Sequence, residues 1–468
     1  MFKKVLVANR GEIAVRIIRT LKEMGITAVA IYSTADRESL HVQLADEAVC
    51  VGGPKAKDSY LNMKNILAAA IGTGAEAIHP GYGFLSENAE FARLCESCGL
   101  TFIGPKPETI DLMGNKEHAR EQMKQAGVPV IPGSDGDVNS VEAACQVASQ
   151  LGYPVLIKAA AGGGGKGIRR VDNEAELKEA FPQAQQEALV SFRDGRMYLE
   201  KILEHVKHIE VQVFGDAQGN AVYFPERDCS LQRSKQKVIE ESPCVLISPA
   251  ERAKLGAIAI KAVRALHYLN TGTLEFLMDQ DHHFYFMEMN TRIQVEHTVT
   301  EMVTGVDLVQ LQIEVAAGMP LKVKQDQLLP HGHAIECRIN AEDPVNNFRP
   351  STGQVKDLYL PVGNLGMRID TALYPGVTIS PFYDSMIAKV VALGATREAA
   401  IAKVRRLLKE MVIKGIHTNQ AFHLRILADP GFLAGKATTN YLEQVILPRL
   451  QGEIETKKRS GLSRLTGE

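Results

Sequence analysis

The stretch Glu288-Met-Asn-Thr-Arg-Ile-Gln-Val-Glu296 alternates polar or charged side chains with residues that are apolar or Thr. In a β-strand, this period of two places every second side chain on the same face. The preceding run His283-Phe-Tyr-Phe-Met287 is rich in aromatic residues, which favours an extended strand at least as far as Asn290. Beyond Asn290 two interpretations stay open, because Thr291 to Gln294 is equally compatible with a loop that redirects its side chains.

A polar turn at Asp279-Gln-Asp-His282 precedes this strand, and counting back from the turn puts Glu275 directly opposite Glu288. Two adjacent carboxylates repel each other unless a cation or a proton lies between them. With the Asn290 amide beside them, the oxygen ligands favour Mg²⁺ or Mn²⁺, and such a metal ion predicts a nucleotide phosphate nearby. The alternative is an amphipathic hairpin with a solvated polar face, which the continued polar series after Asn290 disfavours.

The composition is that of an ordinary globular protein. The 468 residues are enough for about three domains, and 45% of them are apolar. Lys and Arg number 53 against 55 acidic residues, so charge gives no reason to expect a nucleic acid or membrane partner. The sequence shows neither a signal peptide nor an apolar run of membrane-spanning length. Seven scattered cysteines fit free thiols in a reducing compartment, and we therefore expect a cytoplasmic protein.

The first hundred residues alternate short apolar runs with helical patterns, as in Val5 to Ala8 followed by Glu12 to Met24. This βαβ order predicts a parallel sheet. The turn Asn9-Arg-Gly-Glu12 lacks the G-x-G-x-x-G pattern, so we expect a Rossmann-like domain without a dinucleotide site. A second glycine cluster, His79-Pro-Gly-Tyr-Gly-Phe-Leu-Ser-Glu87, precedes a helix. Spacing alone leaves open whether this cluster lines a cleft or only makes a tight connection.

Composition shifts divide the chain, and the fold class that we expect is α/β (α+β). The predicted units are a Rossmann-like domain at 1–113, a second domain at 114–330 with a glycine-rich flap at about 131–203, a mixed β-rich domain at 331–447, and a mobile tail at 448–468. The tail is assigned because its last part is polar, charged and without periodicity.

The flap contains a strand that ends at Lys158, a glycine run that includes Gly164 and Gly165, and a second strand that begins at Ile168. The glycines therefore connect a hairpin and do not open a helix. Lys166 is followed by Gly167, so the Walker A pattern fails. We interpret the loop as a flap whose backbone N–H groups close over phosphate oxygens, and the alternative is a bare linker.

Two further stretches belong to the same predicted site. Glu200-Lys-Ile-Leu203 is an apolar connector that suits an adenine ring, although many edge strands have this pattern. Gln232-Arg-Ser-Lys-Gln-Lys237 is a basic run, for which the usual explanation is a solvated charged face. Next to a metal and a phosphate site, anion capture is the better interpretation.

This order of parts resembles the ATP-grasp enzymes. Within that superfamily, several long motifs are similar to biotin carboxylase over about residues 1 to 447. They are Asn9-Arg-Gly-Glu-Ile-Ala14, His79-Pro-Gly-Tyr-Gly-Phe-Leu-Ser-Glu-Asn88, the basic run at Gln232, Glu288-Met-Asn-Thr-Arg-Ile-Gln-Val-Glu-His297 and Glu336-Cys-Arg-Ile-Asn-Ala-Glu-Asp-Pro344. The resemblance implies an ATP-grasp fold between a Rossmann-like N-terminal domain and a mixed β-rich C-terminal domain.

The resemblance also implies roles for individual residues. The ATP and metal residues would be Lys116, Lys158, Gly164, Gly165, Glu200, Lys201, Ile202, Leu203, His208, Gln232 and Lys235, with two divalent ions on Glu275, Glu288 and Asn290. Bicarbonate would lie between Lys237, Arg292, Gln294 and the backbone of Val295, with Glu296 as its base. Arg338 would face the ureido oxygen of biotin, and Tyr82 would border that pocket.

Three positions depart from the family pattern that we expect. Lys235 stands where His is common, Thr298 replaces a Pro, and Lys166 replaces an Arg in the flap. None of them removes a reacting group. Rival interpretations are an ATP-grasp ligase that joins a carboxylate to an amine, and a nucleotide-binding regulatory subunit without catalysis.

The expected partners follow from the same resemblance. No Met-Lys-Met motif for biotin attachment appears, so biotin would arrive on a separate biotin carboxyl carrier protein, with a carboxyltransferase as the next subunit. We expect acetyl-CoA as the final acceptor of the carboxyl group, as in acetyl-CoA carboxylase, and the alternatives are another acyl-CoA or pyruvate. A homodimer is implied, with Arg19, Glu23 and Arg368 as possible interface positions, for which ordinary surface charge pairs are the alternative.

Overall fold

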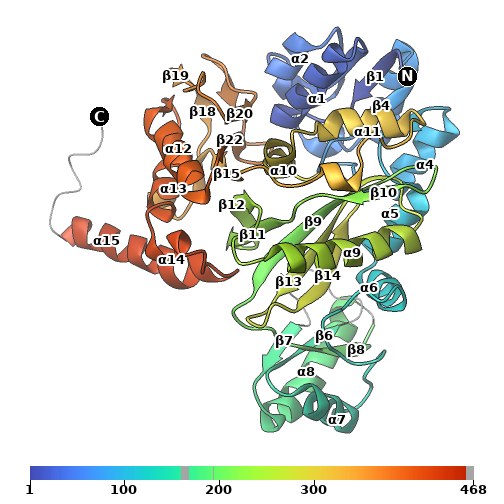
Figure 1. The fold of residues 1–468 in the computed structure, drawn as a ribbon, viewed down its shortest axis with the longest axis vertical. Helices are drawn as coiled ribbons and strands as arrows, with labels where there is room; N and C mark the ends of the chain where they lie inside the picture. The colour runs from blue at the N-terminus through green and yellow to red at the C-terminus, as the bar shows by residue number, and fades with distance from the viewer. Residues whose placement is uncertain (160–167, 193, 460–468) are drawn as a thin grey trace.

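The computed structural model describes residues 1–159, 168–192 and 194–459. Its ribbon shows an N-terminal α/β domain, a small lobe at the opposite end, and a long sheet between them that continues into the C-terminal region (Figure 1). Among the described residues, no helix is both long enough and apolar enough to cross a membrane.

The first sheet is parallel throughout, in the order β3-β2-β1-β4-β5, which confirms the βαβ prediction. Val5 and Val7 of the central strand β1 pack towards α1, while Leu6 between them packs on the other side with residues of α3 and α4. The sheet is thus covered on both faces, as parallel sheets usually are. The elements are β1 (Lys4–Val7), α1 (Gly11–Glu23), β2 (Thr27–Ser33), α2 (Leu40–Leu44), β3 (Glu47–Gly52), α3 (Met63–Thr73), β4 (Ala77–His79), α4 (Ala89–Ser97), β5 (Thr101–Phe102) and α5 (Pro107–Gly114).

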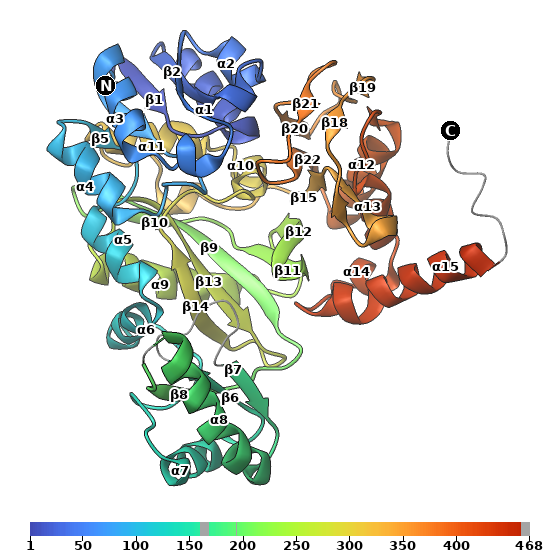
Figure 2. The ribbon, with the colours of Figure 1, turned by 180° about the vertical axis from the view of Figure 1, so that it is seen from behind.

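The small lobe is a three-stranded antiparallel sheet with the order β7-β6-β8, and two helices pack against it (Figure 2). Lys158 pairs with Ile168 across the β6-β7 hairpin, as predicted for the strands on either side of the glycine run. Gly164, Gly165 and Lys166 lie outside the described residues. The elements around this lobe are α6 (Lys116–Gln125), α7 (Val141–Leu151), β6 (Val155–Ala159), β7 (Ile168–Val171), α8 (Glu174–Phe192) and β8 (Met197–Lys201).

The long sheet runs in the order β14-β13-β9-β11-β12-β15-β22-β20, with β10 added beside β9. It begins in the central region of the chain and continues into the C-terminal region, because β12 pairs with β15. Its elements are β9 (Lys207–Gly215), β10 (Ala221–Tyr223), β11 (Arg227–Arg233), β12 (Gln236–Ser242), α9 (Pro249–Ala265), β13 (Asn270–Met278), β14 (Phe284–Asn290), α10 (His297–Thr304), α11 (Leu308–Ala316), β15 (His333–Asn340), β20 (Met367–Thr371) and β22 (Met386–Gly394).

The central strand β9 shows why one face of this sheet can hold charge. Ile209, Val211 and Val213 lie in an apolar core with residues of α9. His208, Glu210 and Gln212 alternate with them and point to the opposite face, where they are buried as well. Buried polar groups require partners, so a polar network on this face is expected.

The C-terminal helices pack on the end of the long sheet. They are α12 (Arg397–Glu410), α13 (Gln420–Ile426), α14 (Pro430–Leu433) and α15 (Leu447–Arg459). Short strand pairs complete this region: β16 (Glu342–Asp343) with β17 (Arg349–Pro350), β18 (Gly353–Gln354) with β21 (Thr378–Ile379), and β19 (Leu358–Tyr359) with β23 (Val412–Ile413).

Of the segment expected to be a mobile tail, residues 448–459 belong to the helix α15, while 460–468 lie outside the described residues. Leu447, Leu450 and Ile454 pack against the C-terminal apolar core. Their spacing of three and four residues is that of one helix face. The abundant charged residues around them hide this short pattern in the sequence.

Candidate active site

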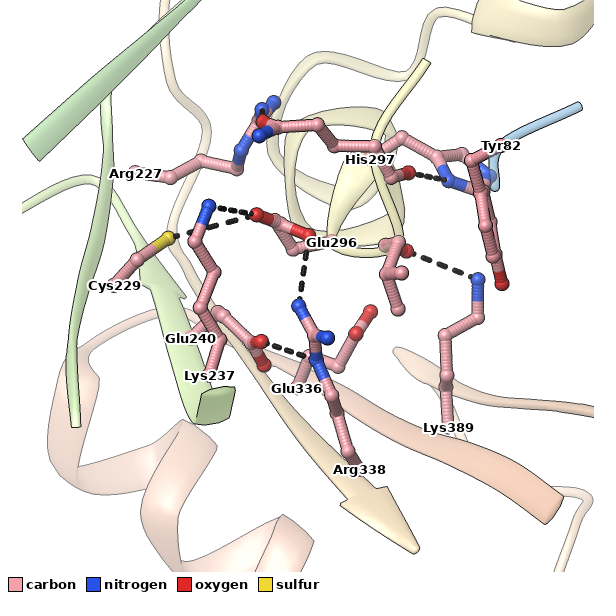
Figure 3. Close-up of polar contacts among 12 residues, drawn as sticks. Tyr82, Arg227, Cys229, Lys237, Glu240, Glu296, His297, Glu336, Arg338 and Lys389 are labelled. Carbon is pink, nitrogen blue, oxygen red and sulfur yellow. Dashed lines mark hydrogen bonds and ion pairs between the residues drawn. The ribbon is translucent and has the colours of Figure 1, made fainter. Parts of the chain in front are cut away.

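Lys237 is the centre of the polar face of the long sheet. Its Nζ donates to a carboxylate of Glu210 at 2.5 Å and of Glu275 at 2.8 Å. It also donates to Glu296 at 2.6 Å (Figure 3). Burial by itself lowers the pKa of a lysine, but the three carboxylates outweigh it and raise the pKa of Lys237 well above its usual value. The ammonium is therefore charged, and it gathers three acids that would otherwise repel one another.

Glu296 is shared between two cations. One of its oxygens accepts from Lys237, and the other accepts from Arg338 Nη2 at 2.9 Å. Only 1% of Glu296 is exposed. Burial raises the pKa of a carboxyl group, but Lys237 and Arg338 reverse this effect and hold the pKa of Glu296 well below its usual range. Glu296 is thus an ionised carboxylate that is protected from bulk water, so it is in the protonation state that a general base requires.

The sheet and one loop bring these groups together. Lys237 is on β12 and Arg338 is on the neighbouring strand β15, although they are a hundred residues apart in sequence. The strand β14 ends at Asn290, so the interpretation of Thr291 to Gln294 as a loop is confirmed. Glu296 is the N-cap residue of α10, and the loop before it turns its side chain towards Lys237.

Arg227 holds several polar side chains of this site in place. It is fully buried and donates to Glu210, to Gln212 at 3.0 Å, and to Gln294 Oε1 at 2.7 Å. The amide nitrogen of Gln294 in turn donates to Glu275 at 2.7 Å. Gln294 is therefore oriented on both sides, which places this predicted bicarbonate residue beside the Lys237 cluster.

The predicted metal residues are next to this cluster. Glu275 lies opposite Glu288 in the β13-β14 hairpin, as predicted from the turn. Asn290 Nδ2 donates to Glu275 Oε1 at 2.9 Å, and Lys116 Nζ lies 3.3 Å from Glu288. Burial alone would raise the pKa of Glu275, but Lys237 and a nearby histidine lower it. The two facing carboxylates and the Asn290 amide are a set of hard oxygen donors that fits Mg²⁺ or Mn²⁺.

Arg292 hydrogen-bonds to Glu87 and to Asn290. Its Nε donates to Glu87 at 2.8 Å, and its Nη2 donates to Asn290 Oδ1 at 2.9 Å. Glu87 was not selected by the sequence analysis, although it belongs to the second glycine cluster. The cluster Arg292, Asn290 and Glu87 therefore lies at the edge of the Lys237 site and ties the N-terminal domain to the hairpin.

The predicted nucleotide residues are more dispersed. Lys158 pairs with Glu200 across the small lobe, and Lys201 Nζ donates to the backbone oxygens of Gly152 at 2.7 Å and of Tyr153 at 3.1 Å. Ile202 and Leu203 follow β8 as an irregular connector, and the Ile202 N–H donates to Pro154 O at 3.1 Å.

Three other predicted nucleotide residues differ in exposure. Gln232 Nε2 contacts His208 Nδ1 at 2.9 Å, and His208 Nε2 lies 3.2 Å from Glu275, so this pair joins the nucleotide residues to the acidic cluster. Lys235 is exposed in the tight turn between β11 and β12, with φ +65°. The basic run thus splits, because Lys237 is buried at the site whereas Lys235 faces solvent.

Of the three departures from the family pattern, Lys235 and Thr298 are within the described residues. The hydroxyl of Thr298 donates to Glu336, whose other carboxylate oxygen is buried without a partner. Burial raises the pKa of Glu336 well above its usual value, and the facing Glu240 adds to this effect. Glu240 also accepts from Arg338. The Thr298 hydroxyl therefore bonds to a carboxyl group that faces Glu240, the partner of Arg338. Lys166 lies outside the described residues.

Several residues of this network were missed by the sequence analysis, above all Glu210, Arg227, Glu240 and Lys389. For Glu210 a signal was present, since it lies two residues from His208, on the polar face of the same alternating strand. Lys389 donates to the backbone oxygen of Val295 at 3.0 Å and sits in a run of apolar residues, where a lone lysine is unusual.

Comparisons with known protein families agree along the chain. Three family models match it: the N-terminal domain of biotin carboxylase at residues 1–110, the ATP-binding domain of the carbamoyl-phosphate synthase L chain at 115–324, and the C-terminal domain of biotin carboxylase at 336–444. Biotin carboxylase 1 of Bacillus subtilis (strain 168) is 54% identical over 444 residues, which cover 95% of this chain and 98% of that protein.

Two solved structures are similar at comparable identity. One is the biotin carboxylase domain dimer of the Hydrogenobacter thermophilus 2-oxoglutarate carboxylase, in complex with MgADP, ADP and bicarbonate; it is 50% identical, with a TM-score of 0.86, over 95% of this chain and 98% of that one. The other is the biotin carboxylase subunit of pyruvate carboxylase, which is 51% identical with a TM-score of 0.86 over the same shares of the two chains.

Proposed function

The chain belongs to the biotin carboxylase family, and we propose that its Lys237 cluster activates bicarbonate with ATP and transfers the carboxyl group to biotin on a carrier protein. The observation that carries the proposal is a buried, ionised Glu296 held between Lys237 and Arg338, beside the facing carboxylates of Glu275 and Glu288. A base, an anion site and a site for a divalent cation thus lie within one network.

The first chemical step needs a base. Bicarbonate is a poor nucleophile until it loses its proton, and Glu296 is in the ionised state that accepts one. Lys237, Gln294 and the backbone of Val295 hold the anion, and Arg292 reaches it by leaving Glu87. Attack on the γ-phosphate of ATP breaks its bond to the oxygen that bridges it to the β-phosphate, and gives carboxyphosphate and ADP. Lys116, Lys158 and the flap with Gly164 and Gly165 bind the phosphates and neutralise their charge during this transfer.

The second step takes place at Arg338. Carboxyphosphate breaks down to CO₂ and phosphate, and the phosphate removes the proton from biotin N1′. The negative charge is then shared with the ureido oxygen of biotin, where a fixed cation stabilises it, and N1′ attacks CO₂ to form the N–C bond of carboxybiotin. Arg338 supplies that cation from a strand at the edge of the cluster, and Tyr82 borders the pocket.

The nucleotide and metal sites complete the proposal. Glu200, Lys201, Ile202, Leu203, His208, Gln232 and Lys235 seat ATP. Glu275, Glu288 and Asn290 hold two divalent cations, which, when bound, neutralise charge on the phosphates. A cytoplasmic location accords with seven unpaired cysteines.

We propose a separate biotin carboxyl carrier protein and a carboxyltransferase as partners, and acetyl-CoA as the final acceptor. The relatives include the biotin carboxylase subunit of pyruvate carboxylase and the biotin carboxylase domain of 2-oxoglutarate carboxylase. Pyruvate and 2-oxoglutarate are therefore alternative acceptors, and an assay with each acyl-CoA or keto acid would distinguish them. A homodimer with Arg19, Glu23 and Arg368 at the interface is part of the proposal, and the mass of the protein in solution tests it.

The first experiment is ATP hydrolysis by the purified protein with Mg²⁺, with and without bicarbonate and free biotin. We expect hydrolysis to require bicarbonate and to rise with biotin, and to disappear in Glu296→Ala. Hydrolysis that ignores both compounds would favour another ATP-grasp ligase. A folded protein without any hydrolysis would favour a regulatory nucleotide-binding subunit.

A further inference from the structure

Lys389 is a lysine without any exposed surface, in the middle of β22. It lies directly opposite Arg338 on β15 and Asp370 on β20. Residues that face each other across a sheet have their side chains on the same face. Lys389 therefore lies on the same face of the sheet as the proposed biotin arginine. The proposed function assigns no residue of its strand, β22.

The ammonium of Lys389 joins three separate segments. It donates to the backbone oxygen of Val295 at 3.0 Å, and it lies 3.1 Å from Glu12 Oε2 on α1. The other oxygen of Glu12 accepts from the hydroxyl of Tyr82, and the ammonium is 5.8 Å from the centre of the Tyr82 ring. Figure 3 shows Lys389 beside Tyr82, with its bond to the backbone before Glu296.

The position of the backbone contact is what connects Lys389 to the chemistry. The carbonyl of Val295 belongs to the peptide group that joins Val295 to Glu296. A bond to this oxygen restrains the residue that would contact bicarbonate and, at the same time, the start of the proposed base. The hydrogen bond has a charged donor, and such bonds are stronger than those between neutral groups.

The protonation state of Glu12 depends on its burial and on Lys389. Burial raises the pKa of Glu12 to about 7, although Lys389 acts in the opposite direction. Without Lys389 the pKa of Glu12 would rise further, and Glu12 would bind a proton at neutral pH. Tyr82 would then donate to a neutral acid, which is a weaker acceptor than a carboxylate.

We propose that Lys389 is a positioning residue, which holds the Val295–Glu296 peptide and, through Glu12, the hydroxyl of Tyr82 in the geometry that the reaction needs. This inference rests on the proposed function, because it assigns bicarbonate and base roles to the peptide that Lys389 binds. A purely structural explanation is that Lys389 only neutralises Glu12 and Asp370, whose Oδ2 is 3.9 Å away.

The test is Lys389→Met, measured as kcat and as KM for bicarbonate, ATP and free biotin. We expect kcat/KM for bicarbonate to fall about 100-fold, because small misplacements of reacting groups have effects of this size, while KM for ATP stays within about twofold. The double variant Glu12→Gln/Lys389→Met removes the ammonium together with its paired carboxylate. It should fold and show the same selective loss, since it still lacks the bond to Val295.

Arg397→Met is the matched control. Arg397 is also a buried cation on the C-terminal region, and it pairs with Glu241 and donates to the backbone oxygens of Phe432 and Leu433. It contacts none of the proposed reacting groups. We expect it to lower the temperature of unfolding without changing KM for bicarbonate.

The outcomes separate the two hypotheses. If wild-type hydrolysis ignores bicarbonate, both the proposed function and this inference are overturned. If the wild type requires bicarbonate, but Lys389→Met and the double variant keep the kinetic constants of Arg397→Met, the positioning role alone is overturned. A selective loss for bicarbonate in both Lys389 variants supports it.

Discussion

The site has two halves that differ in how their lysines are held. Lys237 has 12% of its side chain exposed and binds three carboxylates, so its position is fixed before any substrate arrives. Lys116 has 81% of its side chain exposed, and within the described part of the chain its ion-pair partner is Glu288, at 3.3 Å. We infer that the half where protons and charge move is organised in advance, whereas the nucleotide half depends on the phosphates to order its lysines.

The largest effect is expected for Lys237→Met. The change leaves Glu210, Glu275 and Glu296 without their shared cation, and removing one partner of a buried ion pair costs about 3–5 kcal/mol of stability. Bicarbonate-dependent turnover should fall by at least about 10³-fold, through lost anion binding and a base that is poorly ionised. The measurement is turnover together with thermal unfolding.

The pH profile makes this first prediction sharper. Lys237 is the main group that lowers the pKa of Glu296, so its removal raises that pKa. Any remaining activity should therefore decline at a higher pH than in the wild type as the solution is acidified. Lys207→Met is the control, because Lys207 is a buried lysine that pairs with Asp228 at 2.7 Å outside the cluster. Equal losses of turnover in Lys237→Met and Lys207→Met would contradict a specific role for the Lys237 cluster.

Sequence could predict the parts of the site that depend on local periodicity. The pairing of Glu275 with Glu288 followed from a turn and a count of residues, and β13-β14 has that register. The central role of Lys237 among three acids did not follow, because its partners are 27, 38 and 59 residues away. A period of two identifies the residues of one face but not which distant strand lies beside it.

The end of β14 illustrates the same limit. The alternation from Glu288 to Glu296 continues through the loop, so the sequence alone could not show that the strand stops at Asn290. The contact between Arg292 and Glu87 spans 205 residues and joins two domains. Tertiary contacts of this kind decide the direction of loop side chains, and no local pattern records them.

The next effect in size is expected for Arg338→Met. Arg338 donates to both Glu240 and Glu296, so its loss removes the proposed cation for biotin and alters the cluster. Turnover stimulated by biotin should fall about 100-fold, as when one preorganised donor is removed from an oxyanion site, while ATP binding changes little. Equal losses in biotin-stimulated turnover and in ATP binding would contradict this assignment.

A smaller effect is expected in the nucleotide half, for Lys116→Met. A hydrogen bond to a charged group contributes at least about 1.5 kcal/mol, and a mostly exposed lysine is at this low end, so KM for ATP should rise roughly tenfold. The temperature of unfolding should stay unchanged, because the side chain is mostly exposed. Lys124→Met is the matched control, since Lys124 is on the same helix α6 and pairs with Asp135. A large loss of stability in Lys116→Met would show that this half is also organised in advance.

The smallest effect is expected for Lys235→Asn. Lys235 has φ +65°, and asparagine tolerates this left-handed conformation better than most residues, so the variant removes the charge and preserves the turn. Because Lys235 is exposed and lies apart from the Lys237 cluster, KM for ATP should rise by no more than about threefold, as surface charges contribute little. A rise as large as that of Lys116→Met would mean that the turn closes on the nucleotide. The basic run would then act as one unit in both halves of the site.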